Sequence, residues 1–186
     1  MTDINFSNPS GAPDSRASEA RSSATAPAGL RWDIIELLFF AYRDFVGDAD
    51  HELEAFGFWR AHHRVLHFVY RYPGLKVADL LDVLRITKQS LGRVLKQLLD
   101  EGYIVQKAGN NDRRQRLLFA TAKGEALVAR LAGLQTDRLN RALSDLAPSG
   151  VDAVRQFLRA MIDRDDPDKV LETIFGTGNA TVKAKE

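Results

Sequence analysis

Basic side chains gather in one stretch of this 186-residue chain. Between Arg85 and Lys123 there are nine Lys and Arg residues against three acidic ones, a net charge of +6, whereas the whole chain carries +1. Guanidinium and ammonium groups at this density bind phosphates, as they do on the nucleic-acid face of a protein that is otherwise near neutral. Charge alone leaves a second interpretation open, a basic surface that is only solvated.

The histidines are the second group that could do chemistry. All four lie within residues 50–67, and His63 and His67 are four residues apart, so a helix places both imidazoles and Tyr70 along one face. Such a pair suits two ligands of one metal ion or haem. A structural zinc site needs four ligands, however, and the chain has no cysteine. We favour histidines that form hydrogen bonds at a helix junction. Two alternatives remain: histidines that bind an organic effector through hydrogen bonds, and histidines that bind a metal ion or haem.

Other chemistries lack their residues. The absence of cysteine excludes a disulfide framework, a Cys-ligated metal and a thiol nucleophile or redox switch. The sequence contains no motif for a Gly-rich phosphate-binding loop or for a Ser-His-Asp triad, so we expect no enzyme activity, no cofactor and no metal. Apolar runs stay short of the ~18–20 residues that span a bilayer, and no secretory signal is visible, so we expect a soluble, cytoplasmic protein.

Helical periodicity begins at Leu30, after a tail. Ser, Ala, Pro and Gly fill 17 of the first 29 positions, which predicts disorder. Residues 30–46 carry two adjacent apolar stripes, so this helix must be covered on two sides, either by another subunit or by a deep core. A second helix is predicted over 58–72, ended by Pro73-Gly74, and a short third over 77–84.

The basic stretch is predicted to hold a helix and a hairpin. Thr87 is an N-cap candidate for a fourth helix, which ends at Gly102. Its apolar side would bury Leu91, Val94, Leu95 and Leu98, and its other side carries Lys88, Gln89, Arg93, Lys96 and Gln97. Residues 103–107 and 116–120 predict a two-stranded hairpin with its tip over 109–114. A long helix is expected over 121–146. Another begins at Pro148-Ser149 and fades at Asp165-Asp166-Pro167, and 168–175 has the pattern of one more short helix.

This order of elements predicts a fold class. It is mainly α with a small β-hairpin wing: a winged helix-turn-helix with N- and C-terminal dimerisation helices. A helix that is polar and basic on one face fits the major groove of B-DNA, and a thin basic hairpin can enter the minor groove.

The motifs resemble the MarR family of transcription regulators. The residues that carry the resemblance are Arg64-Val65-Leu66, Pro73-Gly74 with the stretch through Leu81, the run Thr87 to Leu95, and above all the wing. The wing runs from Asp112-Arg113-Arg114 to Thr121-Ala122-Lys123-Gly124 and is similar to the family's D-R-R-x-x-x-L-x-L-T-x-x-G. It departs from the pattern at Ala120 and at Arg116, which adds a charge. The resemblance covers about residues 30–166.

The resemblance implies a homodimer that reads double-stranded DNA at a pseudo-palindromic operator. By motif position, Gln89, Ser90 and Arg93 contact base edges or adjacent phosphates, and Asp112 orients an arginine. The full set of implied DNA-binding residues is Thr87, Lys88, Gln89, Ser90, Arg93, Lys96, Asp112, Arg113, Arg114 and Arg116.

The resemblance also implies a small-molecule effector pocket between the dimer helices and each lobe. The residues that would line it are Phe39, His63, His67 and Tyr70; the family usually has an aromatic residue where His63 stands. The expected domains are a disordered tail over 1–29, the winged domain with its dimerisation helices over 30–166, and an extension, partly disordered, over 167–186. A winged-helix module that binds proteins, and a regulator that responds to metal or haem, remain alternative functions.

Overall fold

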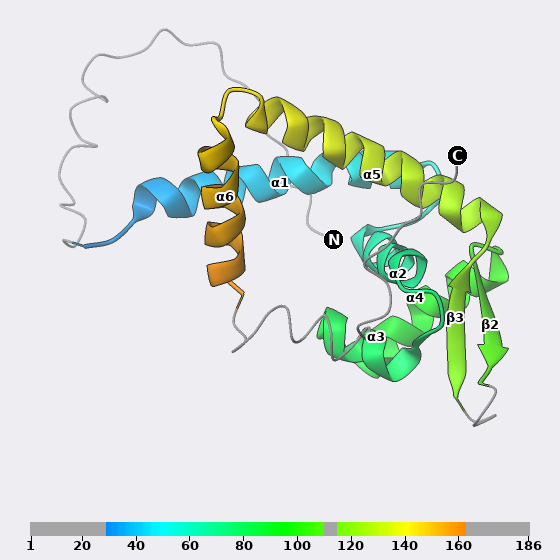
Figure 1. The fold of residues 1–186 in the computed structure, drawn as a ribbon. Helices are drawn as coiled ribbons and strands as arrows, with labels where there is room; N and C mark the ends of the chain where they lie inside the picture. Colours follow the sequence, from blue (N-terminus) through cyan, green and yellow to red (C-terminus); the bar gives the residue numbers. More distant parts are fainter. Residues whose placement is uncertain (1–28, 110–114, 163–186) are drawn as a thin grey trace, which may run out of the picture. The chain divides into compact units, whose positions relative to one another are not determined.

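The structure is a computed structural model, which describes residues 29–109 and 115–162. The chain divides after Leu38 into two units. In the first unit, described from residue 29, the first turns of α1 (Trp32–Glu54) are almost entirely exposed, and the Arg31 guanidinium pairs with Asp33 at 3.1 Å just ahead of them. The second unit, described over residues 39–109 and 115–162, holds the rest of α1 and all the other helices and strands of Figure 1.

The predicted order of elements is confirmed. After α1 come α2 (Arg60–Arg71), α3 (Val77–Leu84), α4 (Lys88–Asp100), α5 (Ala122–Leu143) and α6 (Pro148–Ala160). The strands are β1 (Leu75–Lys76), β2 (Ile104–Ala108) and β3 (Arg116–Ala120). The fold is therefore mainly helical with a small antiparallel sheet. None of the helices in the described ranges combines the length and the apolar character that crossing a bilayer requires.

The core lies where α2, α3, α4, β3 and the first half of α5 meet. Each of these elements turns its apolar side inward, as the 3.6-residue period of helices and the two-residue period of strands require. Its fully buried side chains include Phe58, Leu66, Leu80, Leu91, Leu98, Ile104, Leu118 and Leu131. Burial of this surface positions α3 and α4 against α2, and the hairpin against α5.

The sheet has three strands, whereas the sequence predicted two. The order is β1-β3-β2, and Leu75 of β1 lies opposite Leu118 of β3. The backbone N–H of Gly74 donates to the Leu118 carbonyl at 2.8 Å. A strand of two residues has no readable alternation, so tertiary pairing alone creates β1.

Several helix boundaries differ from prediction, and three of the differences have a visible cause or exceed two residues. α1 continues beyond residue 46 to Glu54, because Ala49 and Leu53 are completely buried and extend the apolar side through Gly47. α2 begins at Arg60 instead of Phe58, because Phe58 is buried in the core and Trp59 takes the extended N-cap position. α5 ends at Leu143, short of residue 146. The expected helix over 168–175 lies outside the described residues.

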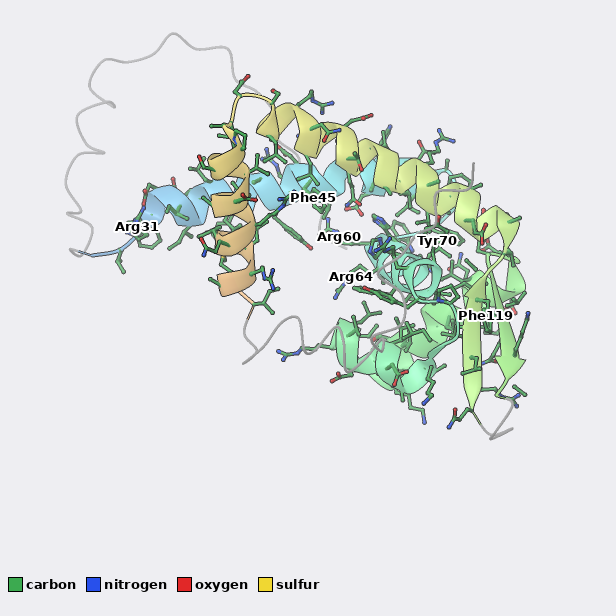
Figure 2. The ribbon with its side chains drawn as sticks, in the orientation of Figure 1. Arg31, Phe45, Arg60, Arg64, Tyr70 and Phe119 are labelled. Carbon is green, nitrogen blue, oxygen red and sulfur yellow. The ribbon has the colours of Figure 1, made fainter. Side chains whose placement is uncertain are left out.

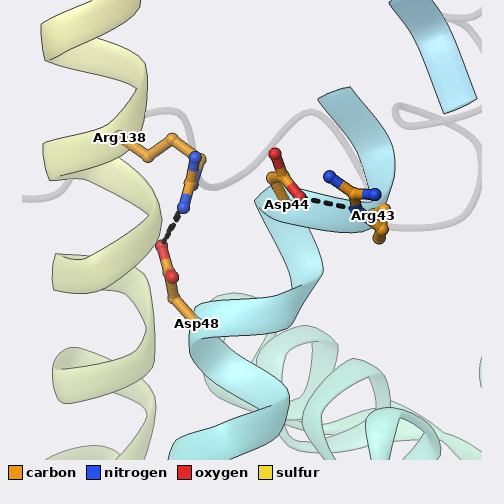
Figure 3. A network of polar contacts seen from close by, with 4 residues as sticks. All are labelled: Arg43, Asp44, Asp48 and Arg138. Carbon is orange, nitrogen blue, oxygen red and sulfur yellow. Dashed lines mark hydrogen bonds and ion pairs between the residues drawn. The ribbon is translucent and has the colours of Figure 1, made fainter. Parts of the chain in front are cut away.

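Ion pairs join the later part of α1 to α5. Figure 3 shows Arg138 of α5 reaching Asp48 of α1, with 2.9 Å between Nη2 and Oδ2 and a second hydrogen bond from Nε at 3.0 Å. Arg130 of α5 pairs with Glu52 of α1 at 2.9 Å. Within α1, Arg43 pairs with its neighbour Asp44 at 2.7 Å (Figure 3).

Candidate nucleic-acid interface

The start of α4 is built by its N-cap. The Ser90 backbone N–H donates to Thr87 Oγ1 at 3.1 Å, and the Thr87 hydroxyl donates to Ser90 Oγ at 2.9 Å. These bonds satisfy one of the free N–H groups at the helix start and confirm Thr87 as the cap. They also leave Thr87 and Ser90 at the surface.

The turn between α3 and α4 is held from two sides. Arg85 has φ +49°, in the left-handed region, and its backbone N–H donates to Leu81 O at 3.0 Å. Arg64 of α2, labelled in Figure 2, donates from Nη2 to the Leu84 carbonyl at 3.2 Å. α2 therefore holds the carbonyl that precedes the turn between α3 and α4.

α4 has one buried and one exposed side. Leu91, Val94, Leu95 and Leu98 are buried, as predicted. Exposed side chains stand opposite them: Lys88, Gln89, Ser90, Arg93 and Lys96. Lys96 forms an ion pair with Asp100 one turn later, whereas nothing in the described ranges pairs with Lys88 or Arg93. The predicted polar face is thus present, with two uncompensated cations.

Gln97 departs from that face. The sequence placed it beside Lys96, but its side chain turns toward α2, where its Oε1 lies 2.9 Å from His62 Nε2. Its amide nitrogen donates to Glu101 Oε1 at 2.8 Å and to Gly57 O at 3.4 Å. Position 97 lies at the border of the two helix sides, where spacing alone cannot decide between solvent and a polar partner.

β2 and β3 form the wing. Their ladder runs from Ile104 opposite Ala120 to Ala108 opposite Arg116, and the Gly109 N–H donates to Gln115 O at 3.1 Å. Arg116 is exposed at the outer end. The Lys107 ammonium lies 4.9 Å from the centre of the Phe119 ring, which Figure 2 labels on β3. The wing residues Asp112, Arg113 and Arg114 lie outside the described residues.

The base of the wing is locked to α5. The Thr121 hydroxyl donates to Gly102 O at 2.7 Å and accepts from the Gly124 N–H at 3.2 Å, so it closes the hairpin and caps α5. The Lys123 ammonium donates to Glu101 O at 3.0 Å. Thr121 and Lys123 of this motif therefore join the start of α5 to the turn between α4 and β2.

The residues predicted to line an effector pocket are only partly brought together. The His63 and His67 rings lie on one side of α2 with centroids 6.5 Å apart. Tyr70 is exposed on α2, and Phe39 is 68% exposed on α1. Ring contacts in the described part of the chain join neither of them to the histidines.

The three histidines of α2 favour the neutral form; His62 and His63 are buried and His67 is half-buried. Burial lowers the pKa of His62, His63 and His67 below the usual imidazole value, and a positive neighbour adds to this for two of them: His67 when charged for His63, and Arg71 for His67. For the metal alternative, the described ranges contain no cluster of three or more His, Cys, Asp or Glu able to hold an ion.

Comparison with known proteins places this geometry in a family. The model of the MarR family matches residues 56–115, which span the helix-turn-helix and the first part of the wing. The HTH-type transcriptional regulator PetP of Rhodobacter capsulatus is 45% identical over 129 residues, which cover 69% of this chain and 78% of PetP. The chain belongs to the MarR family.

Solved structures of MarR-type regulators share the fold. A SlyA-like transcription regulator from Listeria monocytogenes superposes with a TM-score of 0.60 at 19% identity, covering 78% of this chain and 97% of that one. FabT of Streptococcus pneumoniae, solved in complex with DNA, gives a TM-score of 0.62 at 15% identity over 69% of this chain and 92% of FabT. This MarR-family chain is a helix-turn-helix transcription regulator, with α3 and α4 as the helix-turn-helix and β2–β3 as the wing.

Proposed function

We propose that this MarR-family regulator binds a pseudo-palindromic operator in double-stranded DNA as a homodimer. The observation that carries the proposal is the exposed side of α4, where Lys88, Gln89, Ser90 and Arg93 project from a helix whose other side is buried. A helix held in this way can enter the major groove with these side chains toward the base edges.

The proposed roles follow from position and chemistry. Gln89, Ser90 and Arg93 lie along the exposed side and contact bases or the adjacent phosphates, whereas Lys88 and Lys96 contact phosphate. Thr87 holds the helix start. On the wing, Arg116 adds charge to Arg113 and Arg114, which enter the minor groove or bind its phosphates, and Asp112 orients one of them.

The homodimer is proposed because apolar side chains of α1 and α6 are exposed in the described part of one chain. Phe39 and Phe40 of α1 are 68% and 55% exposed, and α6 has no buried residue although Phe157 and Leu158 lie on it. At ~25 cal/mol per Å² of apolar area, covering two such helices contributes substantially to stability. A second copy of the chain supplies matching helices, so we propose residues 30–166 as the dimerising winged domain between terminal segments 1–29 and 167–186.

DNA recognition is tested with a duplex selected from random sequence by the full-length protein. We expect Arg93→Ala to weaken binding by ~1–3 kcal/mol and to relax preference at particular bases, and Lys96→Ala to weaken all sequences alike. Affinity should fall steeply with salt, because phosphate contacts release counterions. Arg31→Ala removes one charge outside the basic stretch and serves as the control. If Arg93→Ala binds like wild type with the same preference, α4 is not the reading helix, and a protein-binding winged helix is favoured.

The dimer is tested by sedimentation at micromolar concentration. We expect a dimer for the wild type, and a shift toward monomer or loss of folding for Phe157→Glu, which places a charge in the proposed interface. A folded wild-type monomer at that concentration would refute the dimer.

The proposal includes a small organic effector that binds beside α2. His63 and His67 can donate or accept hydrogen bonds in the neutral form, and Phe39 and Tyr70 add aromatic surface. A panel of aromatic acids and phenols should include a compound that raises the melting temperature of wild type and lowers operator affinity. His63→Phe should abolish both effects, and a response that this variant retains would remove His63 from the site.

A further inference from the structure

The His62 imidazole lies between the start of α2 and the C-terminal half of α4. It is buried and stacks on the Phe58 ring, with centroids 4.8 Å apart and planes inclined by 12°. Its Nδ1 lies 3.0 Å from the Trp59 backbone nitrogen, and its Nε2 lies 2.9 Å from Gln97 Oε1. One side chain therefore touches the cap of one helix and the body of another.

These partners define the tautomer. The Trp59 N–H can only donate, so Nδ1 is the acceptor and the ring proton sits on Nε2, which donates to Gln97 Oε1. The Gln97 amide then donates to Glu101 Oε1 at 2.8 Å and to Gly57 O at 3.4 Å. The result is one directed chain of hydrogen bonds from the start of α2 to the end of α4, in which each member polarises the next.

The helix cap alone does not need a histidine. His62 is the third residue of α2, where Glu or Gln commonly accepts from the N-cap N–H. The imidazole accepts that bond and also reaches α4. Gln97 follows Arg93 by four residues, so this contact holds α4 one turn from the proposed base-reading arginine.

We propose that His62 is a positioning residue for DNA reading: its neutral Nε2–H form holds Gln97 and so fixes the orientation of the exposed side of α4. The inference rests on the proposed DNA binding through α4. It further assigns a pH sensitivity to recognition, because a proton on Nδ1 would face the Trp59 N–H and remove the acceptor.

The surroundings of His62 set the direction of that sensitivity. Glu101, at the end of α4, attracts an imidazolium, and Tyr103 lies across the Phe58 ring at 4.9 Å with the Lys123 ammonium 4.0 Å above its own ring. Burial is the largest influence and lowers the pKa of His62. Near neutral pH the hydrogen bond from His62 Nε2 to Gln97 Oε1, which we call the clamp, is therefore intact, and acidification weakens it.

Two substitutions separate the clamp from the cap. His62→Gln keeps an acceptor for the Trp59 N–H but removes the contact with Gln97, and Gln97→Met keeps the size of the side chain without the acceptor. Under conditions where each protein is fully folded, we expect either change to weaken binding to the selected duplex roughly fivefold to tenfold. Binding to a random duplex should stay the same, and the double variant should lose little more than either single one. His51→Gln, an exposed histidine of α1, is the control.

The pH profile tests the histidine itself. As the pH falls from about 7.5 past the lowered pKa of His62, the ratio of selected to random affinity should fall in wild type and in His51→Gln, and stay nearly flat in His62→Gln. His63→Gln and His67→Gln show whether the other two histidines of α2 contribute to the pH dependence of this ratio. If His62→Gln fails to fold, the ratio measured with Gln97→Met decides.

An unchanged ratio in both single variants, or a wild-type pH slope in His62→Gln, would overturn the inference alone. A wild-type protein that selects no duplex would overturn the proposed function and this inference with it.

Discussion

Replacing Gly124 with alanine should destabilise the protein although glycine is a poor helix former. Gly124 lies in the first turn of α5, and a Cβ there would stand 2.1 Å from the Tyr103 carbonyl oxygen and 3.3 Å from Leu66 Cδ1. The first distance is more than 1 Å below ordinary contact. Its partner is backbone rather than a flexible side-chain end, so α5 and the base of the wing must separate.

The magnitude follows from the groups that move. Forcing a methyl group into a packed site costs about 1–3 kcal/mol. The Tyr103 carbonyl accepts from the Thr121 N–H at 3.1 Å, and loosening this bond costs about 1 kcal/mol more. Alanine returns about 1 kcal/mol through its higher helix propensity. We therefore expect Gly124→Ala to lower the free energy of unfolding by about 1–3 kcal/mol.

Urea unfolding followed by circular dichroism measures this effect. All proteins are compared at one concentration, because the stability of a dimer depends on it. Gly133→Ala is the matched control: it lies in the same helix with nothing within 4 Å of the added Cβ, and should gain up to about 1 kcal/mol. If Gly124→Ala unfolds at the wild-type urea concentration while the control behaves as expected, the close packing of α5 on Tyr103 is refuted.

Three further changes test the local geometry. Arg85→Gly should raise the free energy of unfolding by about 1 kcal/mol, because φ +49° suits glycine; a lower urea midpoint would contradict the strained turn. Thr87→Ala should cost about 1 kcal/mol through loss of the α4 cap, and an unchanged melting temperature would show that the cap is dispensable. Since burial lowers the pKa of His63 and His67 in the folded state, the unfolded chain binds more protons once the pH falls below about 6.5. The free energy of unfolding should therefore decrease below about pH 6.5 until the pH has passed the lowered pKa values of the folded state. The double variant His63→Phe with His67→Phe should lose less stability over this range. A decline as steep as that of wild type would show that other groups cause it.

Most of the helices and strands could be predicted from local sequence patterns. The spacing of Leu91, Val94, Leu95 and Leu98 predicted both α4 and its buried side, because a helix returns to the same side every 3.6 residues. Thr87 predicted where α4 starts, since few residues can cap a helix end. The strand over 116–120 was predicted with both ends correct, because Gln115 and Thr121 bound a short apolar run.

Long-range partners set what local patterns could not. The extension of α1 to Glu54 depends on Ala49 and Leu53 meeting a core built from later helices. Strand β1 exists because β3 pairs with Leu75, and a pair of residues has no periodicity of its own. The same holds for the candidate DNA-binding site. The exposed cations of α4 could be predicted from the sequence, but the contact of the Gln97 side chain with α2 could not.

The order of the elements, the concentration of charge between residues 85 and 123 and the family motif follow from the amino-acid sequence alone, because they depend on neighbours within a turn or a hairpin. Three contacts exist only in the folded chain: His62 meets Gln97 across 35 positions, Arg64 holds the carbonyl of Leu84, and Gly124 packs so closely on Tyr103 that it admits no side chain. Each of these depends on two segments distant in sequence reaching hydrogen-bonding or van der Waals distance. Packing of the whole core determines that approach, and no local pattern encodes it.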